Sequence, residues 1–450
     1  MRATAYPTSS TPDESTALGS ATTSESCKVN THTLRFEEFT IPPKYAILSH
    51  RWEGEEVSYA EYCAEARPTG RRWTKILGCC ETARSRGHNY VWIDSCCIDK
   101  RSSAELSEAI NSMWDWYSQA TECLAFLVDV SPIPQESDQL GRKMLLKGLQ
   151  LSEWFRRGWT LQELLAPRVV TFYTSHWQVI GEKCDPDILS ALSQVTRIPK
   201  PCLLSQTALR TRCVAHRFSW AARRTTSRPE DMAYCLLGLM GVNMPLLYGE
   251  GDKAFLRLQQ EIVKQSDDES IFAWRFIAPP TGFMSGVLAP KVQDFSESGD
   301  VNLLQGERPP YAITNKGLEI RSTATYLPSA EIYILQLNCS YTVKFDGEAQ
   351  EIPCEIAIRK DHGAFFRVLT SRMSVHTRTI ASEATFKESL RRATYYIRLS
   401  RWDHDYQPAI VMLQKFARNW RARRNNEDIS KAAISRAAWH QVQRQDAENP

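Results

Sequence analysis

The feature that most constrains the fold of this chain is a strand–helix–strand pattern within residues 87–130. Residues 90–93 are a run of aromatic and β-branched side chains, which is typical of a buried strand. Ser102 and Glu105 then have capping-box spacing, and apolar residues recur at helical spacing after them. Residues 124–128 form the next apolar run. A strand, a crossover helix and a second strand predict a right-handed βαβ unit, and therefore a parallel sheet.

The same alternation extends to both sides of this unit. Residues 45–48 form an apolar strand, and residues 71–86 form a helix with one apolar side. On the other side, Pro167 stops a short helix at residues 159–166, because the residue before a proline is driven out of the helical region. Residues 169–173 then form a further buried strand. This order predicts an α/β fold with a small, doubly wound parallel sheet.

The rest of the sequence divides into regions of different pattern. The N-terminus is rich in serine and threonine, so we expect it to be disordered, and residues 132–148 are polar and typical of a surface insertion. Beyond residue 271 the apolar pattern changes to period two, with Asp346 and Gly347 as a hairpin turn. The predicted regions are a disordered N-terminus at 1–32, the α/β domain at 33–180, a helical extension at 181–275, an antiparallel β domain at 280–400 and a basic helical tail at 405–450.

Composition and charge exclude several classes of protein. The net charge of +3 is too small to indicate nucleic acid as a partner. No run approaches the ~18 consecutive apolar residues of a membrane span, and the N-terminus lacks the apolar core of a signal peptide. The 13 cysteines are scattered, with no C-x-x-C motif and no zinc-type spacing. We therefore expect reduced thiols, no metal, no membrane span and a cytoplasmic location.

Three weaker patterns each have a more ordinary alternative. Cys96 and Cys97, with His50 elsewhere in the sequence, suggest a thiol nucleophile, but nothing in the sequence indicates a lowered thiol pKa. Residues 249–254 fit a G-x-G-x-x-A fingerprint, although the lack of a full strand before them favours a tight turn that opens a helix. The stretch from Leu413 to Arg423 has the spacing of an IQ-type helix for a calmodulin-like light chain, and a solvated basic helix has the same pattern.

Three ordered segments resemble the motifs of a known family. They are YAILSHRW, YVWIDSCCIDKRSSAELSEAINSMWDWY and RGWTLQELLAP, and they are followed by RFSWAARRTTSRPEDMAYCLLGLMGVNMPLLYGEGDKAFLRLQQEI. Together they resemble the fungal heterokaryon incompatibility (HET) domain and the segment that commonly follows it, over roughly residues 33–275. One departure is Glu53, where the family often has glycine after the tryptophan, and Gly54 comes one position later.

The resemblance implies a process more clearly than a reaction. Proteins of this family act in non-self recognition when genetically different fungal hyphae fuse, and the domain triggers cell death. This implies a homo-oligomer formed on activation, with receptor-type incompatibility proteins as candidate partners. The HET domain is also distantly similar to the Toll/interleukin-1 receptor (TIR) domain, which has a flavodoxin-like fold. Some TIR domains are scaffolds and others cleave NAD.

Glu163 is the candidate catalytic residue that the TIR similarity implies. Trp159, Leu161, Glu163 and Leu164 resemble the stretch that carries the glutamate of TIR-type NAD glycohydrolases. A carboxylate beside the ribose stabilises the oxocarbenium character that develops when the nicotinamide–ribose bond breaks. The structural alternative is that Thr160 and Glu163 form a capping box at the start of the helix. The two roles are compatible with each other.

A nucleotide pocket is compatible with the predicted sheet. Ser49 and Asp94 are predicted to follow neighbouring strands at their carboxyl ends, where ligands bind in open α/β sheets. Alternatively, such Ser and Asp side chains cap their own loops, and the tryptophans are core residues. The candidate pocket consists of Ser49, Arg51, Trp52, Asp94 and Glu163, with NAD as the candidate substrate and no bound cofactor. Two mechanisms follow, which are signalling by self-association with a structural Glu163, and an NAD-cleaving site completed by assembly.

Overall fold

The first half of the chain is built around a seven-stranded sheet. The computed structural model of the protein describes residues 26–64, 69–134, 139–275, 284–306, 310–328, 331–345, 348–361, 364–368 and 391–398. The strand order in this sheet is β2-β1-β4-β3-β5-β6-β7. Its centre is parallel and contains β4 (Tyr90–Trp92), β3 (Ala46–His50), β5 (Glu122–Phe126) and β6 (Val170–Tyr173).

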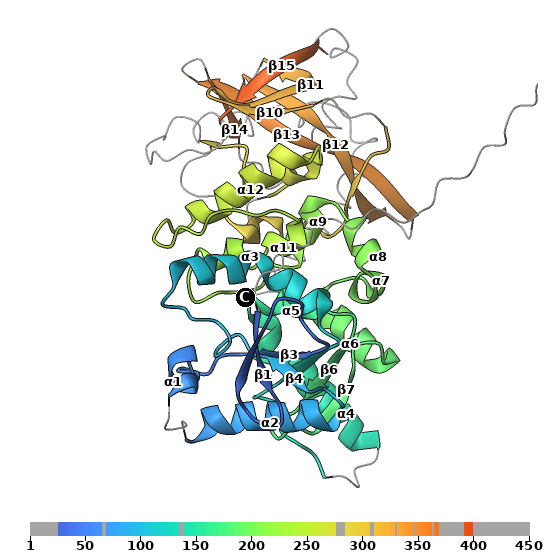
Figure 1. The fold of residues 1–450 in the computed structure, drawn as a ribbon. Helices are drawn as coiled ribbons and strands as arrows, with labels where there is room; N and C mark the ends of the chain where they lie inside the picture. The colour runs from blue at the N-terminus through green and yellow to red at the C-terminus, as the bar shows by residue number, and fades with distance from the viewer. Residues whose placement is uncertain are drawn as a thin grey trace, which may run out of the picture.

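Helices cover both faces of this sheet, which explains why its central strands are mostly apolar. Helix α2 (Arg71–Ser85) lies on one face, and α3 (Ser103–Gln119) and α5 (Thr160–Leu165) lie on the other (Figure 1). Every residue of β3, β5 and β6 is buried as a result. The predicted α/β fold with a doubly wound parallel sheet is therefore confirmed.

The start of α3 shows only half of the predicted capping box. The Ser102 hydroxyl accepts a hydrogen bond from the Glu105 backbone N–H at 3.3 Å. The Glu105 carboxylate accepts instead from the Asp99 backbone N–H at 2.8 Å, which holds the loop before the helix. At the other end of α3, the Tyr117 hydroxyl donates to the Leu48 carbonyl at 2.8 Å and so fixes the helix on β3.

The edges of the sheet differ from the prediction. Strand β1 (Ser26–Asn30) pairs antiparallel with both β4 and β2 (Phe36–Phe39), so the predicted disorder of residues 1–32 is wrong from Ser26 onward. At the opposite edge, β7 (Val179–Glu182) pairs antiparallel with β6. Both edge strands are short, and their pairing depends on partners that the local sequence does not show.

The predicted surface insertion at residues 132–148 contains a helix. Helix α4 (Gln139–Leu151) buries Leu145 and Leu149 and packs against α6 (Pro186–Thr196). Its apolar residues have helical spacing, but lysines between them give the stretch a polar composition. The helix is followed by the 3₁₀ turn η1 (Glu153–Arg156) and then by α5.

A region of short helices links the two sheets. Within the predicted helical extension, two short helices follow each other, α10 (Asp231–Tyr234) and α11 (Leu237–Met240). Gly249 and Gly251 both have positive φ, and their backbone N–H groups donate to the Glu230 carboxylate at 2.8 and 3.0 Å. The predicted tight turn before a helix is therefore confirmed, with a carboxylate in its concave side. The other helices of the region are α7 (Lys200–Leu204), α8 (Gln206–Arg210), α9 (Val214–Ser219), α12 (Lys253–Gln265) and the 3₁₀ turn η2 (Glu269–Phe272).

The second sheet has eight strands and is antiparallel except for the pairing of β14 with β15. Two of its pairings are hairpins, β10 with β11 and β12 with β13. The residues of the predicted turn between β12 and β13, Asp346 and Gly347, lie outside the described residues. Arg367 ties this sheet to the helical region, because its guanidinium donates to the backbone carbonyls of Phe272 and Trp274 at 2.7 and 2.6 Å. The strands are β8 (Met284–Ser285), β9 (Val301–Leu303), β10 (Ala312–Thr314), β11 (Gly317–Leu327), β12 (Ile332–Phe345), β13 (Glu348–Asp361), β14 (Ala364–Val368) and β15 (Arg391–Ile397).

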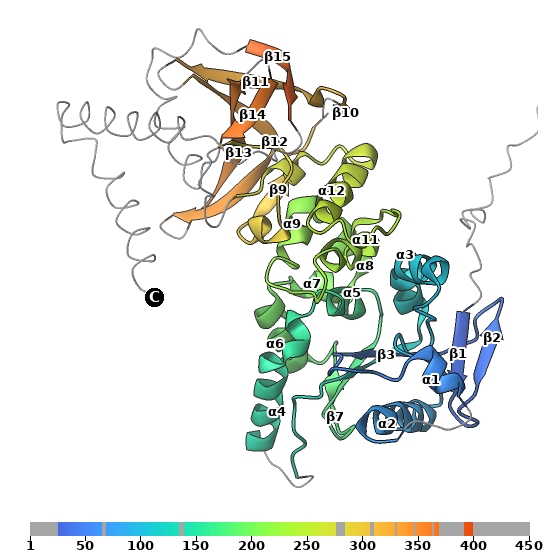
Figure 2. The same cartoon turned by 90° about the vertical axis from the view of Figure 1, so that its left-hand side faces the viewer.

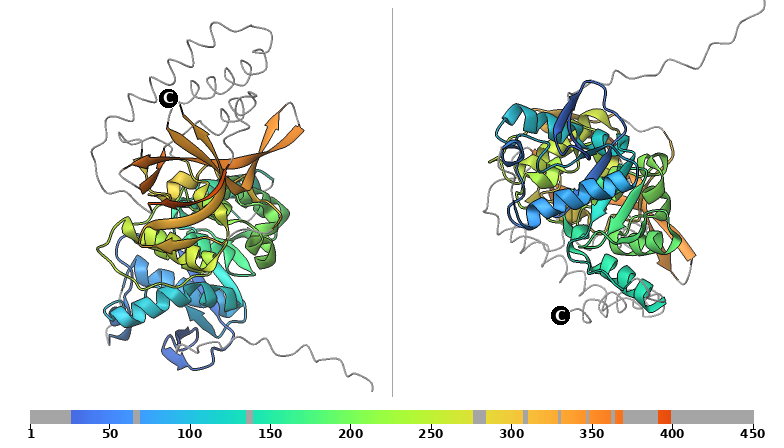
Figure 3. Two further views of the ribbon diagram at one scale, coloured as in Figure 1. Left: turned by 90° about the horizontal axis from the view of Figure 1, so that it is seen from above. Right: turned by 60° about the horizontal axis from the view of Figure 1, so that its bottom comes forward.

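These parts are arranged as three tiers. The seven-stranded sheet and its helices form one end, the helical region lies in the middle, and the antiparallel sheet forms the other end (Figures 1 and 3). No helix in the described ranges is long and apolar enough to cross a membrane. The predicted tail at 405–450, with the light-chain pattern from Leu413 to Arg423, lies outside the described residues.

Candidate functional site at the carboxyl end of the parallel sheet

Ser49 lies at the centre of a buried hydrogen-bond chain. It is the fourth residue of β3 and is fully buried. Its hydroxyl accepts a hydrogen bond from the Trp154 indole N–H at 2.9 Å and donates to the Glu163 carboxyl group at 2.5 Å. The single proton and one lone pair of the hydroxyl are therefore both used. This chain joins the end of β3 to η1 and to α5.

Glu163 is a buried acid rather than an exposed carboxylate. Its side chain projects from α5, and the residue is only 7% exposed. Burial, together with the negative charge of Asp94, raises the pKa of Glu163 to about 8, although the Ser49 hydrogen bond and two nearby arginines, Arg157 and Arg224, oppose this rise. At neutral pH the group therefore retains its proton for most of the time.

The alternative role of Glu163 in a capping box is wrong. The Thr160 hydroxyl donates to the carbonyls of Trp154 and Arg157, at 2.5 and 3.0 Å, instead of accepting from the helix. Arg224, which is 2% exposed, donates through Nη1 to the same hydroxyl at 3.0 Å and so brings a guanidinium from the helical region into this interior. Burial lowers the pKa of Arg224 to about 10, while the negative charge of Glu163 acts in the opposite direction.

A second branch of the site begins at His50, directly after Ser49. Its Nδ1 lies 3.6 Å from an Asp94 carboxylate oxygen, and the other oxygen of Asp94 accepts a hydrogen bond from the Trp52 indole at 2.9 Å. The Lys100 ammonium group lies 3.6 Å from the centroid of the Trp52 ring, in a cation–π contact. The Trp52 ring is thus held by hydrogen bonding at its edge and by a cation at its face, and is not simply a core side chain.

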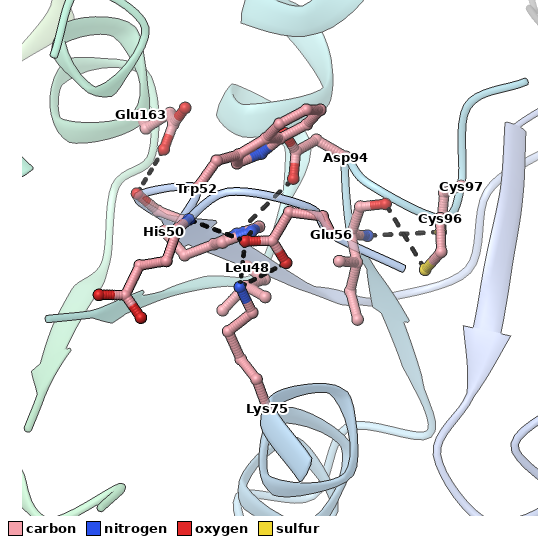
Figure 4. Close-up of polar contacts among 12 residues, drawn as sticks. Leu48, His50, Trp52, Glu56, Lys75, Asp94, Cys96, Cys97 and Glu163 are labelled. Atoms are coloured by element: carbon pink, nitrogen blue, oxygen red, sulfur yellow. Dashed lines mark hydrogen bonds and ion pairs between the residues drawn. The ribbon is translucent and has the colours of Figure 1, made fainter. Parts of the chain in front are cut away.

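Glu56 and Lys75 complete this branch from the side of α2. The Lys75 ammonium group donates to both Glu56 oxygens at 2.6 Å, and the same carboxylate lies 3.7 Å from Nε2 of His50. Burial opposes ionisation, but the contacts with His50 and Lys75 lower the pKa of Glu56 to about 2. His50 is therefore placed between two carboxylates, Glu56 and Asp94, as Figure 4 shows.

Four of the five residues of the predicted pocket come together. Ser49 contacts Glu163, and Trp52 contacts Asp94, at the carboxyl ends of neighbouring parallel strands. Arg51 follows His50 in the chain but has no hydrogen bond or ion pair with any residue that the structure describes. Sequence reasoning missed Trp154, Glu56, Lys75 and Arg224, although the tryptophan and arginine lie inside the segments quoted above or next to them.

The suggestion of a thiol nucleophile is wrong for Cys96 and Cys97. Both are buried, and Cys97 accepts a hydrogen bond through its sulfur from the Ile93 backbone N–H at 3.4 Å. Burial raises the pKa of Cys96 well above its ordinary value, which disfavours the thiolate. These cysteines are structural parts of the turn that follows β4.

Comparison with known proteins points to one family. Residues 45–144 match the family described as heterokaryon incompatibility protein (HET), and residues 253–305 match a domain of unknown function, DUF8212. The vegetative incompatibility protein HET-E-1 of Podospora anserina is 42% identical over 227 residues, which are 50% of this chain and only 16% of that protein. No solved structure matches the chain. The HET match contains Ser49, His50 and Asp94, whereas Glu163 lies beyond it.

Proposed function

Because this chain contains a heterokaryon incompatibility (HET) domain, we propose that it acts in incompatibility-type non-self recognition in a fungus and triggers cell death by self-association. The similarity to a vegetative incompatibility protein supports the process. Assembly as the way it acts is proposed from the distant resemblance of HET domains to TIR domains. The activating signal would come from a receptor-type incompatibility protein.

The observation that carries self-association is an exposed apolar stripe on α4. Leu140, Met144 and Leu151 lie on one side of this helix and are 64%, 59% and 65% exposed. Lys143 and Lys147 are exposed beside them. Large exposed apolar residues that share one helix face are typical of interaction sites.

A second copy of this chain is the occupant that charge complementarity favours. The loop before α1 (Tyr59–Cys63) exposes Glu53 and Glu55, so one copy offers acidic groups to the lysines of α4 in the next. A contact between two different surfaces of the same chain propagates into a ring or filament. Such an assembly would bring many HET domains together on activation.

The state of Glu163 supports a structural role for this residue in the resting protein. Its carboxyl group is buried, accepts a hydrogen bond from Ser49 and is protonated at neutral pH. An oxocarbenium ion needs an ionised carboxylate beside it. In the resting conformation Glu163 therefore holds α5 on β3.

The test of self-association is a double substitution on α4. Leu140→Glu with Met144→Glu should keep the purified full chain monomeric at concentrations where the wild type associates, as measured by light scattering during size exclusion. The same variant should fail to kill fungal cells that express it. Gln139→Glu, an exposed position on the same helix, is the matched control. Unchanged association and toxicity in the double variant would refute the proposal.

A second candidate function is NAD cleavage, which the convergence of Ser49, Trp52, Asp94 and Glu163 supports. In that reaction the bond between ribose C1′ and the nicotinamide nitrogen breaks, and its electron pair neutralises the pyridinium. Water then adds to C1′ and loses a proton. A bound pyridinium cation would lower the pKa of Glu163, so the carboxyl group would ionise when the substrate binds.

Glu163→Gln separates the two candidates. NAD content is measured in cells that express the wild type, this variant or Glu108→Gln, an exposed control on α3. If NAD cleavage causes death, NAD falls with the wild type and the control and stays constant with Glu163→Gln. If toxicity persists in Glu163→Gln and NAD never falls, the enzymatic candidate is eliminated.

A further inference from the structure

A polar hollow is lined by residues between Arg197 and Asn302, beyond the residues that match the HET family. Its volume is about 420 Å³, and its lining comes from the helical region and from the segment that leads into the antiparallel sheet. Helix α9 packs there against the 3₁₀ turn η3 (Val292–Phe295) and against β9 (Figure 2). The Cys213 thiol donates to the Val301 carbonyl at 3.1 Å and joins the two parts beside the hollow. A volume of this size is within the range of small-molecule sites.

The lining of this hollow includes buried nitrogen atoms that have no hydrogen-bond partner among the described residues. His216 is 6% exposed, and its buried Nδ1 has no hydrogen-bond partner among the described residues. The buried Nε of Arg212 likewise has none within the part of the chain that the structure describes. Arg197, at the end of α6, adds a second guanidinium to the same lining.

The state of His216 agrees with a site for an anion. Burial and the neighbouring Arg212 lower the pKa of His216 to about 4, although the negative charge of Asp300 opposes this, so the imidazole is neutral at physiological pH. A neutral imidazole can still donate one hydrogen bond, while the two arginines supply the positive charge. A buried donor without an acceptor destabilises a protein, and an oxyanion bound there would satisfy both unpaired nitrogens.

Acceptor groups also line the hollow. Asp300 and Glu297 contribute carboxylates, and Ser219 and Asn302 contribute neutral polar groups. Carboxylates accept hydrogen bonds from hydroxyl groups. The lining therefore combines positively charged donors with carboxylate acceptors, which suits a molecule that carries both an anionic group and hydroxyl groups.

We propose that the hollow lined by Arg197, Arg212 and His216 binds a phosphorylated sugar. Three donor side chains in one lining suit the three terminal oxygens of a phosphate monoester better than the two coplanar oxygens of a carboxylate. Asp300 and Glu297 then bind the sugar hydroxyls. This site is separate from the Ser49–Glu163 site and does not depend on the function proposed for that site.

The test uses calorimetric titration of the full chain with ribose 5-phosphate. The wild type should bind it, and Arg212→Gln should weaken binding roughly tenfold or more, because a hydrogen bond to a charged group is lost. Arg210→Gln, on the exposed side of α8 and outside this lining, is the matched control and should bind like the wild type. Circular dichroism of each variant confirms that it is folded.

Two further ligands test separately whether the phosphate and the sugar hydroxyls contribute to binding. Ribose without phosphate should bind at least about tenfold more weakly than ribose 5-phosphate, and so should inorganic phosphate alone. Equal binding of inorganic phosphate would overturn the assignment of a sugar phosphate. Absence of binding by the folded wild type, or equal loss in Arg210→Gln and Arg212→Gln, would overturn the site itself.

Discussion

The Ser49 hydroxyl and the Glu163 carboxyl group, 114 positions apart in the chain, are joined by a hydrogen bond of 2.5 Å in the protein interior. This bond connects the first strand of the parallel core to the last short helix before its fourth strand. It also explains how a glutamate is tolerated in a fully packed region, because the proton of the serine is directed at it. Four expectations follow from this and related contacts.

Replacing Ser49 by alanine should destabilise the protein. The substitution removes the acceptor of the Trp154 indole and the donor to Glu163 while leaving the packing almost unchanged. We expect a loss of about 1–3 kcal/mol in the free energy of unfolding, as is usual when buried polar groups lose their partner. Urea denaturation measures it, with Ser85→Ala at an exposed position as the control. Equal stability of the two variants would show that the chain of hydrogen bonds contributes nothing.

Glu163 should make the wild type less stable as the pH rises. Its pKa is raised from an ordinary 4.5 to about 8, so between these values the folded state binds more protons than the unfolded state. The stabilisation due to this group is complete below about pH 4.5 and is lost as the pH rises through about 8. Glu163→Gln lacks this titration. Its stability relative to the wild type should therefore increase between about pH 5 and pH 9, and a constant difference would contradict the raised pKa.

Glu122, at the amino end of the central strand β5, should have the opposite pH dependence. Burial opposes its ionisation, but contacts with His88, Arg86 and Thr171 lower the pKa of Glu122 from 4.5 to about 2. Its stabilising effect is present above about pH 4.5 and is lost as the pH falls through about 2. Glu122→Gln should cost roughly 1–3 kcal/mol at pH 7.

That cost should become smaller as the pH falls below about 4.5, because the unfolded wild type then binds a proton at this carboxyl group, whereas the folded state binds it only near pH 2. Unfolding free energies of Glu122→Gln and the wild type at about pH 7 and pH 3 provide the measurement. A difference that is the same at both values would mean that the ionised form of Glu122 is not what stabilises the fold.

Gly238→Ala tests the contact between the helical region and the HET domain. A Cβ atom at Gly238, on α11, would lie 2.1 Å from the Cβ of Trp114 on α3. One of the helices must move, which typically costs about 1–3 kcal/mol. The double variant with Trp114→Gly, which removes the Cβ atom as well as the ring, should lose less stability than the sum of the single variants, and simple additivity in thermal unfolding would exclude the close contact.

Local patterns predicted most of the parallel core. Residues 45–48, 90–93, 124–128 and 169–173 all lie in or beside strands of the observed sheet, because each is an apolar run between polar loops. The same reasoning failed at β1, whose short and partly polar sequence becomes a strand only by pairing with β4. It failed again at α4, where lysines concealed an apolar helical stripe.

The sequence alone predicted that Ser49 and Asp94 would lie at the carboxyl ends of neighbouring strands, because parallel strands joined by helices end on the same side of a sheet. It also predicted the resemblance to the heterokaryon incompatibility family, which residues 45–144 match. The tertiary structure was needed to show that Glu163 is hydrogen-bonded to Ser49 and protonated, with Trp154 and Arg224 beside it. It was also needed to show that His50 lies between two carboxylates. The physical reason is that burial, charge and hydrogen-bond partners depend on groups far away in the chain, and no local pattern records them.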